Sequence, residues 1–203
     1  MKQFRLLLLA LVLSAASGCG DKAPKLAKLG SADVIVAFGD SLTYGTGAAE
    51  HESYPAVLSQ LIGRQVVSAG VPGEVTGQGL ERLADVIDEH HPKLMIVCLG
   101  GNDMLRKVSN AEIKSNLRSI IKNIKDRGIA VVLVGVPQPA LITSAPEFYS
   151  ELAREFAVPY ESTVVTNVLY AAEMKADPIH PNAKGYRRMA EALADLLRKS
   201  GAL

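Results

Sequence analysis

Short apolar runs alternate with amphipathic stretches along most of the chain. The runs are almost continuously apolar, which predicts strands covered on both faces, as in a parallel sheet. They lie at residues 34–38, 65–69, 94–99 and 129–134. Between and after them, apolar residues recur every three or four positions, which predicts helices with one buried face. These helices are expected at residues 54–62, 76–90, 110–127 and 182–200, with a further weak strand near residues 157–158.

The alternation of strands and helices predicts a single α/β domain. Parallel strands joined through helices form right-handed crossovers, which place helices on both faces of the sheet. The expected fold class is therefore a three-layer α/β/α sandwich around a parallel sheet. Ligands of such sheets bind beyond the carboxyl ends of the strands. Residues that carry chemistry are therefore expected directly after the predicted strands.

The N-terminal residues follow a different pattern. Lys2 and Arg5 precede an unbroken apolar run at residues 6–13, and small residues follow. This is the pattern of a secretory signal, and the run is too short to span a bilayer. The Ala-Ser-Gly-Cys sequence at residues 16–19 resembles the lipobox of bacterial lipoproteins, in which the cysteine is acylated.

We therefore expect a lipoprotein signal peptide at residues 1–18, a lipidated N-terminus and tether at residues 19–30, and the folded domain at residues 31–203. Cys19 is the expected lipidation site, and ordinary secretion with a chance cysteine is the alternative. A lipid on Cys19 would anchor the protein to a membrane of the cell envelope, facing the periplasm or the exterior. Gly20 rather than Asp follows the cysteine, which favours the outer membrane without deciding between the two membranes.

Composition excludes several classes of protein. The 22 Lys and Arg residues nearly balance the 21 Asp and Glu residues, and only 5% of residues are aromatic. We therefore expect no nucleic-acid partner, because a general basic field and a base-stacking platform are both missing. The two cysteines, Cys19 and Cys98, are too few for a disulfide scaffold or a multi-cysteine zinc site. No metal or cofactor is expected, and the expected oligomeric state is a monomer.

Polar segments follow three of the predicted strands, and another precedes the last predicted helix. They are FGDSLT at 38–43, GVPGEVTGQGL at 70–80, LGGND at 99–103 and DPIHPN at 177–182. A serine hydroxyl is a poor nucleophile and needs a base that a third group orients. Ser41 stands at a strand end, and Asp177 and His180 lie in a segment whose prolines disfavour helix, so we expect both to be held extended.

Attack on an acyl carbon places negative charge on its oxygen, so donors must be waiting nearby. The backbone N–H groups of Ser41 and Gly73 and the side-chain amide of Asn102 are the candidates. Glycine at position 73 lets the backbone approach a ligand closely.

Together these segments resemble the SGNH hydrolases, also called the GDSL esterase/lipase family. The resemblance covers the expected domain at residues 31–203 and implies a five-stranded, flavodoxin-like sheet, the SGNH hydrolase fold. It implies that Ser41 is the nucleophile, His180 the general base and Asp177 the partner that orients the base. It also implies an oxyanion hole formed by Ser41, Gly73 and Asn102.

Residues 66–83 and 99–106 more closely resemble a bacterial subgroup of thioesterases, lysophospholipases and arylesterases. The implied function is a serine esterase that hydrolyses carboxylic (thio)esters of small acyl or lipid substrates without a cofactor. An O-acetyl esterase acting on cell-envelope carbohydrate and a non-catalytic binding lipoprotein remain alternatives. The G-x-S-x-G elbow of α/β-hydrolases is excluded, because Thr43 stands where its second glycine would be.

Several of these residues also have an ordinary structural explanation. Ser41 could be a helix N-cap, and His180 could be a surface histidine. Asp40 and Asp103 are expected to be structural, and Cys98 is expected to be an inert core thiol.

The segment at residues 137–149 follows the fourth predicted strand and carries large apolar side chains. These side chains either line an acyl pocket or pack beneath the segment. The candidate pocket residues are Leu141, Ile142, Phe148 and Tyr149, together with Met104 and Leu105.

Overall fold

The computed structural model describes residues 24–138 and 144–203. Their sheet has five strands in the order β2-β1-β3-β4-β5, and every neighbouring pair is parallel. The strands are β1 (Ile35–Gly39), β2 (Val66–Gly70), β3 (Leu94–Cys98), β4 (Ala130–Val134) and β5 (Tyr160–Glu161). The fold class predicted from the sequence is confirmed.

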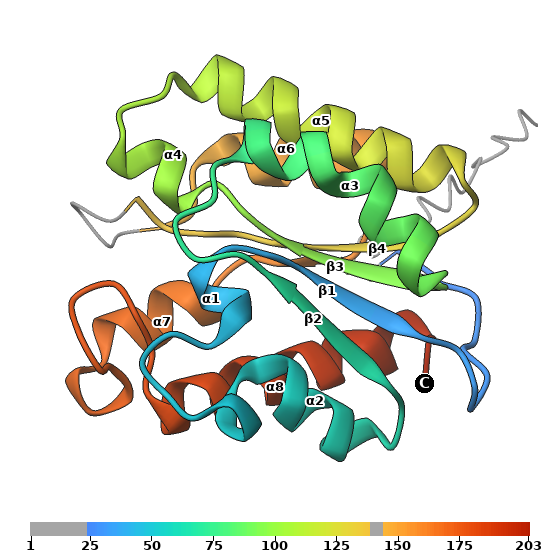
Figure 1. Cartoon of the computed structure of the whole chain (residues 1–203), viewed down its shortest axis with the longest axis horizontal. Helices are drawn as coiled ribbons and strands as arrows, with labels where there is room; N and C mark the ends of the chain where they lie inside the picture. The colour runs from blue at the N-terminus through green and yellow to red at the C-terminus, as the bar shows by residue number, and fades with distance from the viewer. Residues whose placement is uncertain (1–23, 139–143) are drawn as a thin grey trace, which may run out of the picture.

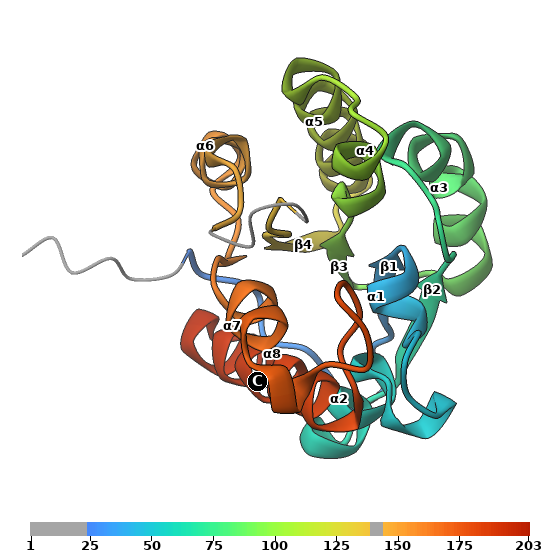
Figure 2. The same ribbon diagram turned by 90° about the vertical axis from the view of Figure 1, so that its left-hand side faces the viewer.

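Helices cover both faces of the sheet (Figure 1). One layer contains α3 (Thr76–His90), α5 (Asn110–Asp126) and α6 (Glu147–Phe156). The other contains α2 (Tyr54–Ile62), α7 (Val164–Tyr170) and α8 (Ala183–Ser200). Two short helices, α1 (Ser41–Tyr44) and α4 (Gly101–Leu105), follow β1 and β3 directly. Figure 2 looks onto this carboxyl edge of the sheet.

The apolar runs have the burial that their pattern predicts. Every residue of β1 and β3 is buried, because these central strands have a neighbour on each side and a helical layer on each face. β2 is an edge strand and only half-buried. The amphipathic helices turn their apolar stripes inward; in α5 the buried side chains are Ile113, Leu117, Ile120, Ile121 and Ile124.

Some individual elements differ from the expectation. The weak strand expected near residues 157–158 is present slightly further along the chain, at Tyr160–Glu161. The sequence pattern did not predict α6 or α7. The sequence of α7, VVTNVLY, is rich in β-branched residues, whose stiff side chains lower helix propensity. Four of its residues are buried, and it packs against α8, so tertiary contacts outweigh propensity here.

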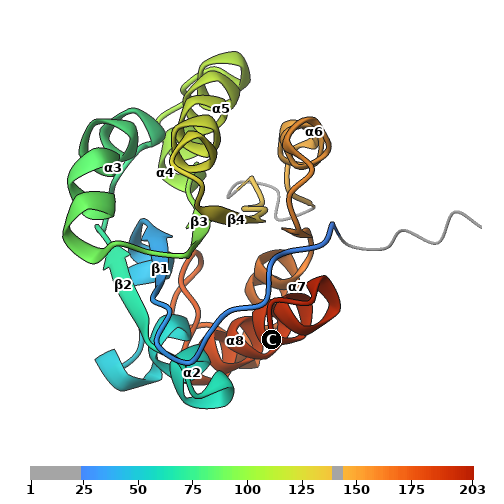
Figure 3. The same cartoon turned by 90° about the vertical axis from the view of Figure 1, so that its right-hand side faces the viewer.

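The N-terminal segment crosses the far end of the molecule from α1 and α4 (Figure 3). Leu26 N–H donates to the Ser200 carbonyl at 2.9 Å and Leu29 N–H to the Ala202 carbonyl at 2.8 Å. Leu29 is buried in the core. Part of the expected tether at residues 19–30 is therefore packed on the domain. Cys19 and the expected signal peptide lie outside the described residues.

The residues that the structure describes contain no helix with the length and apolar character needed to cross a bilayer.

Candidate active site

Ser41 is the first residue of α1, directly after β1. Asp40 is the N-cap of α1, because its Oδ1 accepts the N–H of Leu42 at 3.0 Å. The N-cap interpretation of Ser41 is therefore wrong, and the Ser41 hydroxyl makes a different contact. The N–H of Ser41 belongs to the first turn of the helix, where backbone N–H groups have no partner within the helix.

The structure brings together three side chains that the sequence predicted as one site. Nε2 of His180 lies 3.0 Å from Oγ of Ser41, across 139 positions of sequence. Nδ1 of His180 lies 2.7 Å from Oδ2 of Asp177. When the imidazole is neutral and Nδ1–H donates to the carboxylate, Nε2 is free to accept the serine proton.

The segment that holds Asp177 and His180 is bent. Oδ1 of Asp177 accepts the N–H groups of both Ile179 and His180 at 2.8 Å, which wraps the backbone around the carboxylate. The Asp177 side chain thus makes a local turn, which the positions of the prolines did not predict. Asn182 then caps α8, with its Oδ1 accepting the N–H groups of Lys184 and Gly185 in the first turn of the helix.

The environment of Asp177 favours its ionised form. Partial burial on its own would raise the pKa of this carboxyl group. The hydrogen bond from His180 and the N–H groups of Ile179 and His180 outweigh burial and lower the pKa below its ordinary value. Asp177 is therefore a carboxylate at neutral pH, able to stabilise positive charge on the imidazole.

Gly73 and Asn102 lie on neighbouring parts of the same edge. Gly73 has φ of +80°, a backbone conformation that favours glycine. Its carbonyl accepts Nη2 of Arg106 at 2.8 Å, which links this loop to the end of α4. In α4, Nδ2 of Asn102 donates to the Glu74 carbonyl at 3.0 Å and to Oδ2 of Asp40 at 3.3 Å. The Asn102 amide therefore lies between the Gly73 loop and the turn that carries Ser41.

Asp40 and Asp103 are both buried beside the site. Burial raises the pKa of Asp40 to about 7; the Leu42 N–H opposes this rise, whereas the carboxylates of Glu74 and Asp103 add to it. Asp103 accepts the Thr76 N–H with both carboxylate oxygens, at 3.1 and 2.9 Å, and the Thr76 hydroxyl at 2.6 Å. Asp103 thus braces α4 against the start of α3.

A largely apolar pocket opens beside Ser41 and His180. Its apolar lining comes from α1, α4, α7 and the loops after β4 and before α8. These side chains are Leu42, Leu105, Val136, Pro137, Leu169, Pro178 and Ile179.

The predicted acyl pocket was right only in part. Leu105 lines the pocket, whereas Met104 packs against the core. Phe148 and Tyr149 are buried in the core, where the Tyr149 hydroxyl donates to the Leu99 carbonyl. Leu141 and Ile142 lie outside the described residues. Leu169 and Ile179 also line the pocket and were not predicted from the sequence. The position of Ile179, an apolar residue directly before His180, was the available signal.

Among residues 24–138 and 144–203, the His, Cys, Asp and Glu side chains form no group of three that could hold a metal ion. Cys98 is buried in β3, and burial raises the pKa of its thiol. The Cys98 side chain is therefore a neutral part of the core, as expected.

A hydroxyl hydrogen-bonded to an oriented imidazole is able to attack an acyl carbon, and here such a hydroxyl lies at the strand ends where parallel sheets bind ligands. Fold and site thus define the class as an ester-hydrolysing α/β enzyme. Residues 37–188 match the model of the GDSL-like Lipase/Acylhydrolase family, and the chain belongs to this family, the SGNH hydrolases.

Several relatives are similar over most of their length. The chain is 30% identical over 176 residues to a thioesterase 1/protease 1/lysophospholipase L1 of Escherichia coli, covering 83% of this chain and 85% of the relative. It is 30% identical over 204 residues to an arylesterase of Vibrio mimicus, covering 95% and 96%. The solved structure of AlinE4, an SGNH-hydrolase family esterase, is 32% identical with a TM-score of 0.65, covering 85% of this chain and 98% of AlinE4.

Proposed function

We propose that this protein is a serine esterase that hydrolyses carboxylic (thio)esters of acyl substrates through Ser41, His180 and Asp177. The observation that carries the proposal is the continuous hydrogen-bonded path from Ser41 Oγ through His180 to Asp177, at 3.0 and 2.7 Å. An isolated serine hydroxyl would be a poor nucleophile, and this path supplies both its base and the group that orients the base.

In the proposed reaction, Oγ of Ser41 attacks the acyl carbon while its proton passes to Nε2 of His180. The carbonyl oxygen becomes an oxyanion, which accepts hydrogen bonds from the N–H groups of Ser41 and Gly73 and from the Asn102 amide, where it replaces the long 3.3 Å contact to Asp40. His180 then protonates the leaving alcohol or thiol, leaving an acyl-serine. Water attacks this intermediate with the same base, releasing a carboxylic acid and restoring the serine.

The apolar pocket supports acyl groups as the substrate class. Leu105, Leu169 and Ile179 line it next to the reacting groups, so an acyl chain would leave water as it binds. The names of two relatives, thioesterase 1/protease 1/lysophospholipase L1 and arylesterase, refer to different leaving groups. The proposed enzyme therefore selects for the acyl side of the ester rather than for one alcohol or thiol.

The test is hydrolysis of p-nitrophenyl acetate, butyrate and octanoate by the wild type and by Ser41→Ala. We expect turnover of the longer esters by the wild type and a loss of about 10³-fold or more in kcat for Ser41→Ala, because the nucleophile is removed. Ser119→Ala, in α5, where the half-buried hydroxyl donates to the Ser115 carbonyl, is the control and should keep full activity.

Three outcomes would contradict the proposal. Turnover of acetate alone would favour the O-acetyl esterase, and no turnover by a folded wild-type protein would favour the binding lipoprotein. Full activity of Ser41→Ala would show that a different residue is the nucleophile.

We also propose that Cys19 carries a lipid and anchors the protein in the cell envelope. The support is the basic start, the apolar run and the lipobox-like sequence that ends at Cys19. The expected result is incorporation of radiolabelled palmitate and membrane fractionation by the wild type and by Cys98→Ala. Cys19→Ala should lose both, and equal labelling of Cys19→Ala would contradict the proposal.

A further inference from the structure

An ion pair that the proposed reaction does not use lies behind the active-site loop. Arg82, in α3, donates from Nε to Oε1 of Glu74 at 2.5 Å and from Nη2 to Oε2 at 2.6 Å. Glu74 is 4% exposed and Arg82 is 23% exposed. The guanidinium carbon also lies 4.3 Å from the ring centroid of Phe38. The bidentate contact and the ring below it hold the guanidinium in one orientation.

The same guanidinium holds the ends of two strands together. Nη2 of Arg82 donates to the Ala69 carbonyl at 2.9 Å and to the Gly39 carbonyl at 3.3 Å. Gly39 ends β1, two residues before Ser41, and Ala69 lies in β2 just before the loop that carries Gly73. Arg82 therefore links the two backbone segments that lead to the proposed N–H donors, Ser41 and Gly73.

Glu74 extends this link to the third proposed donor. Its side chain is held by Arg82, and its backbone carbonyl accepts Nδ2 of Asn102 at 3.0 Å. Glu74 also follows Gly73 directly in sequence, so a shift of Glu74 would move the Gly73 backbone and release the Asn102 amide together. All three donors of the proposed oxyanion hole are thus connected to one ion pair.

We propose that Arg82, through Glu74, is a positioning residue that sets the relative placement of the Ser41, Gly73 and Asn102 donors. This inference rests on the proposed function, because the placement of the three donors affects the rate only if an oxyanion forms in the reaction. Donors stabilise an oxyanion only when they are already in place, and a displacement of about 1 Å can cost about 10²-fold in rate. A buried ion pair is also a weak source of stability compared with apolar side chains of similar size.

The decisive variant is the double substitution Glu74→Gln with Arg82→Met. Either single substitution leaves a buried charge unpaired and should lower the melting temperature. The double variant removes both charges, so its melting temperature should recover toward that of the wild type. Its kcat for p-nitrophenyl butyrate should remain about 10- to 100-fold below the wild type with KM changed less than about threefold, since the links to the strand ends are still missing.

A second readout reports on the oxyanion hole directly. Butylboronic acid adds to a catalytic serine as a tetrahedral adduct that resembles the reaction intermediate. Its inhibition constant should rise in the double variant by about the same factor as kcat/KM falls, because both depend on the same donors. If the ion pair had a purely structural role, the inhibition constant would not rise in parallel with the fall in kcat/KM.

The matched control is the exposed pair between Arg118 and Glu155, which is also bidentate, at 2.8 and 2.9 Å. The double substitution Arg118→Met with Glu155→Gln should change neither kcat nor boronate inhibition. If the buried double variant does not fold, Arg82→Lys replaces it. Lysine keeps the charge but cannot hold Glu74 and both carbonyls at once, so its kcat and boronate affinity should fall together.

The results separate this inference from the proposed function. Wild-type kcat and boronate inhibition in the folded double variant, or in Arg82→Lys, would overturn the positioning role. Full activity of Ser41→Ala would instead overturn the proposed serine chemistry, whatever the Arg82 variants show.

Discussion

At the scale of single residues, two carboxyl groups beside Ser41 have opposite pKa shifts. Asp177 is 44% exposed and surrounded by donors, so hydrogen bonds outweigh burial and lower its pKa. Asp40 is 1% exposed, and burial raises its pKa to about 7. Asp177 therefore stays ionised throughout the neutral pH range, whereas Asp40 changes its charge within that range.

Replacement of Asp177 by Asn should reduce kcat by about 10³- to 10⁴-fold, because the amide no longer selects the imidazole tautomer that accepts the serine proton. Stability should change little, since Asp177 lies at the surface. The measurement is kcat on p-nitrophenyl butyrate, together with the melting temperature. Asp195→Asn, in an exposed pair with Arg198 on α8, is the control and should leave both unchanged.

The raised pKa of Asp40 predicts that the fold loses stability as pH rises toward neutrality. Between about pH 4 and pH 7, Asp40 is protonated in the folded state and ionised in the unfolded state. Its contribution to the free energy of unfolding is therefore complete below pH 4 and is lost as the pH rises through 7. Asp40→Asn keeps an oxygen that can cap Leu42 but does not titrate. Relative to this variant, the free energy of unfolding of the wild type should fall by up to about 4 kcal/mol over this pH range. Urea unfolding of both proteins between pH 4 and pH 8 measures this difference, and parallel stability curves would contradict the prediction.

At the scale of elements, the active-site edge depends on a close approach between α1 and β2. A Cβ at Gly70, the last residue of β2, would collide with the backbone at Tyr44, Thr43 and Asp40. A glycine at this position lets the turn that carries Ser41 lie directly on the strand end.

Gly70→Ala should therefore destabilise the protein by about 2–3 kcal/mol and lower kcat, because the added methyl displaces the turn of Ser41. Gly77→Ala, in α3, is the matched control. Its Cβ would meet only the Asn116 side chain at an ordinary 3.7 Å, so stability should stay the same or rise by up to about 1 kcal/mol. Urea denaturation and kcat on p-nitrophenyl butyrate measure both effects, and equal behaviour of the two variants would show that the close approach is unimportant.

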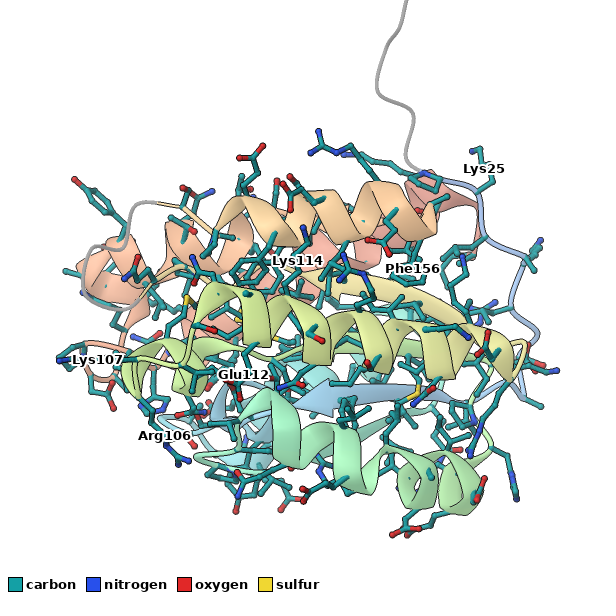
Figure 4. All side chains as sticks on the ribbon, turned by 90° about the horizontal axis from the view of Figure 1, so that it is seen from above. Lys25, Arg106, Lys107, Glu112, Lys114 and Phe156 are labelled. Carbon is teal, nitrogen blue, oxygen red and sulfur yellow. The ribbon has the colours of Figure 1, made fainter. Side chains whose placement is uncertain are left out.

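At the scale of the whole molecule, α8 joins the active site to the opposite end. It begins just after His180 and Asn182, and its 18 residues span about 27 Å. The Ser200 carbonyl at its far end accepts the N–H of Leu26. Figure 4 shows Lys25 at one end of the molecule and Arg106 and Lys107 at the other. A lipid on Cys19, as proposed, would hold the molecule by the end away from its active site.

This separation predicts that the N-terminal segment contributes to stability and not to catalysis. Leu29→Ala should lower the free energy of unfolding by about 2–3 kcal/mol, because the Leu29 side chain is buried in the core. The kcat on p-nitrophenyl butyrate should be unchanged well below the melting temperature. Leu61→Ala is the control: this side chain on α2 is 38% exposed, so its removal should lower the free energy of unfolding by less than about 1 kcal/mol. A loss of kcat in Leu29→Ala would show coupling along α8.

The pattern of apolar and polar residues was sufficient to predict the layers of the fold and the segments that meet at its edge. Buried parallel strands leave continuous apolar runs, and amphipathic helices leave a regular repeat, so 54–62 and 76–90 were predicted as helices to the residue. The polar segments after the strands were readable because parallel strands end at one edge.

Contacts between distant segments determine which local preferences prevail and which side chains meet, and no local pattern predicts them. Packing against α8 made a helix of the β-branched α7, and Asp177 bent a segment that prolines alone would leave extended. The Arg82 links to Gly39, Ala69 and Glu74 have no periodic signature, because they join positions whose proximity exists only in the folded chain. Periodicity records what each segment buries, whereas contacts between distant segments depend on the whole fold.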